Sequence, residues 1–106
     1  MLTLYQAEWC PHSHRVRQAL TERGVDFIAK QVPAEPEDRE EMRRATGDDS
    51  IPLLVLEDGR PIQGAKEILR YVQEQFPRRP DAARHREKLH AEAEDRAPSK
   101  IDDDAP

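Results

Sequence analysis

Short apolar runs and helical patterns alternate over the first part of the chain. Residues 2–5 form an apolar run that is typical of a β-strand. Over residues 11–24 the apolar positions follow helical spacing, and the glycine at the end is a common helix stop. A second apolar run over residues 25–32 predicts another strand. Residues 37–46 then favour a short, exposed helix that ends at Gly47.

The next segment has the pattern of a β-hairpin followed by a helix. Residues 50–56 are mainly apolar, a turn-forming stretch with Asp58 and Gly59 follows, and residues 61–62 resume the strand pattern. Residues 68–76 return to helical spacing. The predicted order is β-α-β-α-β-β-α. Because strands joined by a helix are parallel and a hairpin is antiparallel, we expect an α/β fold with a mixed four-stranded sheet flanked by helices.

The composition changes after Pro77. Residues 78–96 are mostly charged or alanine, with Leu89 as the one sizeable apolar side chain, and the end of the sequence is acidic. We expect one domain over residues 1–77 and a charged segment over residues 78–106 that is partly helical and then disordered. Because this segment offers little apolar surface, its deletion should cost little stability.

The overall composition excludes several classes of protein. Hydrophobic residues make up 36% and charged residues 37% of the sequence, which suits one small core. No stretch approaches the roughly 20 apolar residues of a membrane span, and no leader pattern precedes the first strand, so we expect a cytoplasmic protein without a membrane partner. A net charge of −5 argues against nucleic-acid binding. His85 and His90 lack the spacing of a helical metal pair, and we expect no metal site.

Cys10 is the candidate nucleophile. It stands where the first strand passes into the first helix, and Pro11 follows at the first helical position, where a missing N–H is tolerated. The free N–H groups of His12 and Ser13 and the positive end of the helix dipole should therefore favour a thiolate. A protonated His12 or the nearby Arg15 would strengthen this effect. A buried structural cysteine is the alternative, but such residues usually lie within an apolar stripe.

Three motifs resemble those of glutaredoxins and of the thioredoxin-like N-terminal domain of glutathione S-transferases, over residues 1–77. They are Trp9-Cys10-Pro11-His12-Ser13, followed by His14-Arg15-Val16-Arg17, then Ser50-Ile51-Pro52, and finally Gly64-Ala65-Lys66-Glu67-Ile68. The resemblance implies a thioredoxin-like fold, a cis peptide bond before Pro52 facing Cys10, and backbone pairing of Ile51 with the cysteinyl part of glutathione. It also implies that the helix start at Gly64 and Ala65 receives the γ-glutamyl carboxylate.

The remaining substrate contacts are expected from Trp9 and Arg15. The Trp9 ring can stack on a ligand beside the thiol, or it can pack over the end of the sheet.

A trans proline that merely begins a strand is the alternative to a cis peptide bond before Pro52. We expect no tightly bound cofactor, with glutathione or a similar thiol acting as co-substrate.

The sequence also departs from those families. Ser13 replaces the second cysteine of dithiol glutaredoxins, so any exchange must use one thiol. Ala7 stands where a basic residue is common in glutaredoxins, including those that bind iron–sulfur clusters, and Glu8 adds a negative charge, which argues against a cluster. Ala65 supplies no hydroxyl to the carboxylate site, which leaves backbone N–H groups. The segment after Pro77 is too short for the helical second domain of a transferase.

Two functions of different classes fit these residues. One is a monothiol thiol–disulfide oxidoreductase that reduces thiolated or disulfide-containing proteins with a low-molecular-weight thiol. The other is a glutathione-binding or adaptor module that keeps the groove but turns over slowly, which Ala7 and Ala65 favour. Turnover of a glutathionylated substrate distinguishes them.

Overall fold

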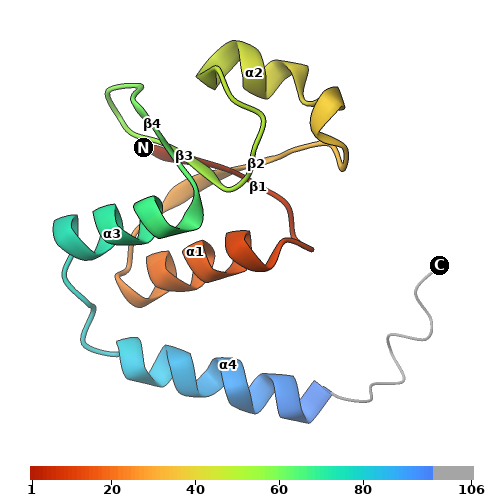
Figure 1. The fold of residues 1–106 in the computed structure, drawn as a ribbon. Helices are drawn as coiled ribbons and strands as arrows, with labels where there is room; N and C mark the ends of the chain where they lie inside the picture. The colour runs from red at the N-terminus through yellow and green to blue at the C-terminus, as the bar shows by residue number, and fades with distance from the viewer. Residues whose placement is uncertain (97–106) are drawn as a thin grey trace.

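The expected elements are present in the computed structural model, which describes residues 1–96. The expected disordered end lies outside these residues. Figure 1 shows the path of the chain. The elements are β1 (Leu2–Gln6), α1 (Pro11–Glu22), β2 (Phe27–Gln31), a 3₁₀ turn (Pro36–Asp38), α2 (Glu40–Thr46), β3 (Leu53–Val55), β4 (Pro61–Gln63), α3 (Ala65–Gln75) and α4 (Ala82–Arg96).

The sheet has four strands in the order β2-β1-β3-β4. β1 and β2 are parallel, with Leu2 opposite Phe27, and β3 is antiparallel to both β1 and β4. Helices α1 and α3 lie together on one face, with α4 beyond them, and α2 lies on the other side of the sheet (Figure 1). The mixed four-stranded α/β fold is therefore confirmed.

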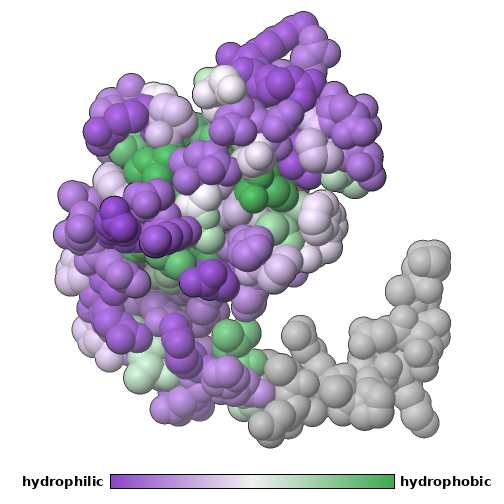
Figure 2. Space-filling model, viewed as in Figure 1, coloured by the Kyte–Doolittle hydropathy of each residue, from purple (hydrophilic) through white to green (hydrophobic). Residues whose placement is uncertain are grey.

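The side chains that alternate along the strands contribute to two cores, one on each face of the sheet. Successive strand side chains point to opposite faces, so Leu2 and Leu4 of β1 lie in the larger core while Tyr5 lies in the smaller one. The buried residues of the larger core under α1 and α3 are Leu2, Leu4, Val16, Leu20, Leu54, Leu56, Ile68 and Val72. The smaller core joins Tyr5 and Leu53 to Met42 of α2. Figure 2 shows a mainly hydrophilic surface over α2, with apolar residues visible between α2 and the helices below it.

Two elements differ from the sequence pattern. β2 is an edge strand, and its Ile28 is 49% exposed, because the expected apolar run meets the sheet on one side only. The helix expected over residues 37–46 begins at Glu40 instead. The preceding 3₁₀ turn starts at Pro36, and the backbone of Arg39 leaves the helical region between the two.

Helix α4 is held to α1 around one buried carboxylate. The Glu22 side chain is 5% exposed, and Arg86 donates to both of its oxygens at 2.9 and 3.0 Å. Arg78 donates at 3.1 Å and Gln18 at 2.9 Å. The segment after Pro77 therefore contributes ion pairs as well as the buried Ala82, which its low apolar content did not predict. We therefore expect deletion of residues 78–106 to destabilise the fold more than the low apolar content of this segment suggested.

Acid should weaken this contact between α1 and α4. Burial disfavours the charged form, but the hydrogen bonds from Gln18 and Arg86 and the charges of Arg86 and Arg78 outweigh it, so the pKa of Glu22 lies below its ordinary value. The carboxylate therefore stabilises the fold above the unfolded-state pKa of about 4.3, and this contribution is lost as the pH falls through the lower folded-state pKa.

The variant Glu22→Gln should be less stable than the parent at pH 7 and should lose less stability on acidification. Thermal unfolding between pH 7 and pH 3 measures both effects. Glu87→Gln is the matched control, because Glu87 makes an exposed pair with Arg84 on α4 itself. Parallel pH profiles for Glu22→Gln and the parent would show that Glu22 does not link α4 to acid stability.

No helix among residues 1–96 is long and apolar enough to cross a membrane.

Candidate functional site

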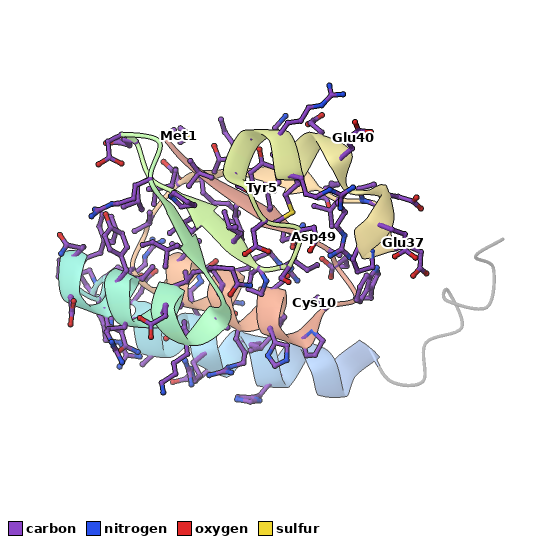
Figure 3. All side chains as sticks on the ribbon, turned by 45° about the horizontal axis from the view of Figure 1, so that its top comes forward. Met1, Tyr5, Cys10, Glu37, Glu40 and Asp49 are labelled. Atoms are coloured by element: carbon purple, nitrogen blue, oxygen red, sulfur yellow. The ribbon has the colours of Figure 1, made fainter. Side chains whose placement is uncertain are left out.

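The predicted site residues gather at one end of the sheet. β1 runs towards Cys10, and Leu53 at the start of β3 pairs with Tyr5 near the end of β1. Ile51 and Pro52 therefore enter the sheet at the end where the chain passes into Cys10 and α1. Gln63 at the end of β4 also pairs with Leu53, which brings the start of α3 to the same end. Figure 3 labels Cys10 at the start of α1.

Cys10 is the N-cap of α1. Its backbone is extended and its sulfur accepts the Ser13 N–H at 3.4 Å, while Pro11 occupies the first helical position. The cysteine is 5% exposed and is not in a disulfide. A helix N-terminus leaves N–H groups without partners in the helix, and here the sulfur takes one of them.

The local groups favour the thiolate of Cys10. Burial alone would raise the pKa of the thiol. The Ser13 hydroxyl, the backbone N–H groups of Ser13 and His12 and the charge of Arg17 act in the opposite direction and outweigh it, so the pKa of Cys10 lies below its ordinary value. His12 thus acts on the sulfur through its backbone N–H, which any non-proline residue would provide.

The Ser13 hydroxyl is placed to stabilise the charged sulfur. It is completely buried and, among the described residues, it has no acceptor at hydrogen-bonding geometry. A serine O–H turns freely about its C–O bond, and the backbone N–H of the same residue already donates to the Cys10 sulfur at 3.4 Å. Formation of the thiolate therefore gives this buried donor an acceptor.

Ser13→Ala should raise the pKa of Cys10, because it removes one donor to the thiolate and leaves the backbone N–H in place. The pH dependence of Cys10 alkylation by iodoacetamide measures this change. His14→Ala is the matched control, since His14 is the exposed next residue of the same helix. Superimposable pH profiles for Ser13→Ala and the parent would show that the hydroxyl does not stabilise the thiolate.

The peptide bond between Ile51 and Pro52 is cis, as the resemblance implied. Pro52 is buried, and its carbonyl oxygen accepts the Gly64 N–H at 3.0 Å, which ties the entry of β3 to the start of α3. Gly64 has a φ of 91°, a backbone conformation that favours glycine, and no side chain caps α3. Ala65 is the first residue of α3 and packs against the larger core.

Arg39 anchors the loop that leads into Ile51. It is 4% exposed, and its guanidinium donates to the carbonyl oxygens of Pro33 at 2.8 Å, Asp49 at 2.8 Å and Ala34 at 2.9 Å. One buried cation thus joins the segment after β2 to the segment before Ile51. The Asp48 carboxylate stiffens the same loop by accepting the N–H groups of Asp49 and Ser50.

The other two predicted contacts lie in different surroundings. Trp9 is 64% exposed directly beside Cys10, so its ring is available to a ligand. Arg15 lines a cleft between α1, α3 and α4 together with His14, Arg86 and Leu89. Its role in substrate binding stays a prediction.

Arg17 is the charged residue near the sulfur that the sequence reasoning did not select. It donates to the side chain of Gln6 and pairs with Glu8 at 3.1 Å. Its position seven residues after Cys10, two helical turns along α1, was the available signal. Long helical side chains lean towards the helix N-terminus, which returns the guanidinium to the Cys10 end of the helix.

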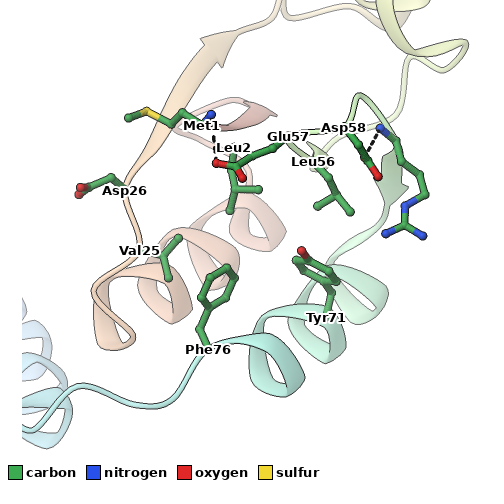
Figure 4. Close-up of a pocket in the computed structure, with 10 residues that line it drawn as sticks. Met1, Leu2, Val25, Asp26, Leu56, Glu57, Asp58, Tyr71 and Phe76 are labelled. Atoms are coloured by element: carbon green, nitrogen blue, oxygen red, sulfur yellow. Dashed lines mark hydrogen bonds and ion pairs between the residues drawn. The ribbon is translucent and has the colours of Figure 1, made fainter.

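An open cavity lies at the far end of the sheet from Cys10. It measures about 660 Å³ and is lined by apolar residues that include Leu2, Tyr71 and Phe76, with acidic residues at its edge (Figure 4). Its place beside the start of β1 separates it from the thiol. Among residues 1–96, no group of three or more His, Cys, Asp or Glu side chains could hold a metal ion.

Curated relatives of the chain are glutaredoxins. The chain is 35% identical over 53 residues to a glutaredoxin of Pseudomonas aeruginosa, which covers 50% of this chain and 63% of that protein. It is 29% identical over 65 residues to glutaredoxin 3 of Escherichia coli, which covers 61% of this chain and 77% of that protein.

Solved structures with the same fold are glutathione S-transferases. One from Methylobacillus flagellatus with glutathione bound superposes with a TM-score of 0.62 at 24% identity and shows the fold. One from Rhodospirillum rubrum has a TM-score of 0.62 at 31% identity. These matches cover 73% of this chain but 38% and 34% of the transferases, so the chain spans little more than a third of their length.

The family comparison spans the whole site. The model of the glutathione S-transferase N-terminal domain matches residues 9–75, which include Trp9, Cys10, Pro52 and Gly64. Because this match covers more than half of the sequence and agrees with the sheet order, the helix-capped cysteine and the relatives above, the chain belongs to the glutathione S-transferase N-terminal domain family.

Proposed function

We propose that the protein is a monothiol thiol–disulfide oxidoreductase that reduces mixed disulfides with glutathione or a similar low-molecular-weight thiol. The observation that carries the proposal is Cys10 at the N-cap of α1, with its sulfur accepting the Ser13 N–H and its pKa lowered by its surroundings. A thiolate is the nucleophile in disulfide exchange. The glutaredoxin relatives support the same chemistry.

The reaction uses two exchange steps. The Cys10 thiolate attacks the glutathione sulfur of a glutathionylated protein, a new disulfide joins Cys10 to glutathione, and the protein thiolate leaves and takes a proton. A second glutathione thiolate then attacks the glutathione sulfur of this intermediate, which forms oxidised glutathione and returns the Cys10 thiolate. Because Cys10 is the only cysteine in the sequence, the second thiol must come from solution.

The groove residues hold the glutathione half in this proposal. The backbone of Ile51 pairs with the cysteinyl part, and the N–H groups at Gly64 and Ala65 receive the γ-glutamyl carboxylate at the start of α3. Trp9 covers the ligand beside the sulfur. No tightly bound cofactor is needed, and a reducing compartment such as the cytoplasm keeps the single thiol available.

A coupled assay tests the function. A glutathionylated peptide is incubated with the protein, glutathione, glutathione reductase and NADPH, and NADPH oxidation is followed. We expect oxidation that depends on both the protein and glutathione and rises linearly with protein concentration. Glutathione binding without turnover would instead favour the binding or adaptor module, which Ala65 supports because it offers no hydroxyl to the carboxylate.

A further inference from the structure

Glu8 and Arg17 form a charge pair beside the nucleophile. Arg17 Nη2 lies 3.1 Å from Glu8 Oε1. The two side chains differ in exposure: Glu8 is 88% exposed, whereas Arg17 is 20% exposed. An ion pair with such an exposed partner contributes little net stability, so Glu8 can leave Arg17 readily.

Arg17 is held in place independently of Glu8. Its other terminal nitrogen donates to Gln6 Oε1. Gln6 is 2% exposed, and its amide nitrogen donates to Gln31 Oε1 at 2.9 Å. A chain of side chains from β1 and β2 therefore positions the guanidinium, and the cation would remain at this point without the Glu8 carboxylate.

Arg17 is anchored on the β2 side of β1, whereas the proposed glutathione groove lies on the β3 side. Gln31 belongs to β2, which flanks β1 on one side, whereas Pro52 leads into β3 on the other side. Because the glutathione half fills the groove beside Pro52, the protein half of the mixed disulfide must lie outside this groove. The residues next to the thiolated cysteine of the substrate therefore meet the rest of the surface around Cys10.

We propose that Arg17 is a carboxylate subsite for the protein half of the mixed disulfide, and that Glu8 occupies it until an acidic side chain of the substrate takes its place. The inference rests on the proposed function and adds a substrate class to it: proteins with Asp or Glu next to the thiolated cysteine. An arginine fork matches a carboxylate in shape and charge. Exchange of one carboxylate for another leaves the partly buried guanidinium of Arg17 paired throughout.

Two probe disulfides separate carboxylate recognition from thiolate reactivity without requiring turnover. Cys10 is reacted with the dianionic dithiobis(nitrobenzoate) and with the neutral dithiodipyridine. In each case the Cys10 thiolate attacks one probe sulfur and joins to that half. The other half leaves as a coloured thiolate from dithiobis(nitrobenzoate), or takes up a proton and leaves as an ultraviolet-absorbing thione from dithiodipyridine. A change in the amount of Cys10 thiolate alters both rates equally, so the ratio of the anionic to the neutral rate reports recognition alone.

We expect Arg17→Gln to lower this ratio about tenfold and Glu8→Gln to raise it about threefold, as for charges at the edge of a binding site. In the Arg17→Gln background the Glu8→Gln change should lose most of its effect. Arg44→Gln and Glu40→Gln are matched controls, because they make the same charge changes in an exposed pair on α2. Both controls should leave the ratio unchanged.

If Glu8→Gln raises the rate ratio equally in the parent and in Arg17→Gln, Glu8 only repels the anionic probe, and the subsite is excluded. A rate ratio that neither variant changes excludes it as well. If Arg17→Gln does not fold, Arg17→Met replaces it, because methionine keeps an apolar stem and removes the charge, and the same comparison is made. Glutathionylated peptides with Glu or Gln beside the cysteine complete the test. Turnover without preference for the Glu peptide contradicts the subsite alone, whereas absence of turnover with both peptides contradicts the proposed function alone.

Discussion

Replacing Cys10 with serine is expected to reduce glutathione-dependent disulfide exchange to the rate of glutathione alone. A serine hydroxyl is not ionised near neutral pH and cannot form a mixed disulfide with the substrate. The fold should survive, because serine is among the preferred N-cap residues and can accept the Ser13 N–H as the sulfur does. We expect the free energy of unfolding to change by no more than about 1 kcal/mol.

The coupled assay and urea unfolding are measured on the same Cys10→Ser preparation. Ser50→Ala is a suitable control, because Ser50 is exposed and lies in the loop before Ile51. Exchange above the glutathione background in a folded Cys10→Ser variant would exclude Cys10 as the nucleophile. Loss of folding would show that the Cys10 cap is essential for the fold. In that case, the exchange activities of Cys10→Ala and of the alkylated parent protein are compared with that of the untreated parent.

Arg39→Met is expected to cause the largest loss of stability among the replacements considered. The methionine keeps an apolar stem but removes three donors, which leaves the carbonyl oxygens of Pro33, Ala34 and Asp49 without the guanidinium. Hydrogen bonds from a buried charged group have large net effects, and we expect a cost of about 3 kcal/mol. Arg39→Lys should recover part of this loss, since an ammonium cannot reach all three oxygens.

The same variants test the loop before Pro52. Arg43→Met is the control, because Arg43 also donates to the loop, through the Asp49 carboxylate at 2.9 Å, but its side chain is 38% exposed. Urea unfolding should show a smaller loss for Arg43→Met than for Arg39→Met. Glutathione affinity should fall in Arg39→Met under conditions where the protein is fully folded. Equal stabilities for the two variants would mean that Arg39 does not anchor the loop.

The features that the sequence predicted depend on neighbouring residues. The order of strands and helices followed from apolar spacing, and the cap at Cys10 followed from a strand that ends just before Pro11. The cis bond before Pro52 came from the resemblance and is confirmed. In each case the physical cause lies within a few residues, where sequence patterns carry the most information.

The features that the sequence did not predict join distant segments. Arg86 meets Glu22 across 64 positions, and Arg39 joins the segments after β2 and before β3. These arginines stand among many charged residues, and nothing in the local pattern marks which of them becomes buried. Likewise, the charge that acts on the Cys10 sulfur comes from Arg17 rather than from the nearer Arg15, because the helix turns Arg15 towards α4.

The most direct test of the central claim is the capture of the intermediate on Cys10. The reduced protein is mixed with a glutathionylated peptide in the absence of free glutathione, quenched with acid and measured by intact and peptide mass spectrometry. We expect one glutathione joined to Cys10 by a disulfide, one equivalent of released peptide thiol, and complete loss of the adduct when glutathione is added. A Cys10 that stays free, or that carries the peptide instead of glutathione, would contradict it.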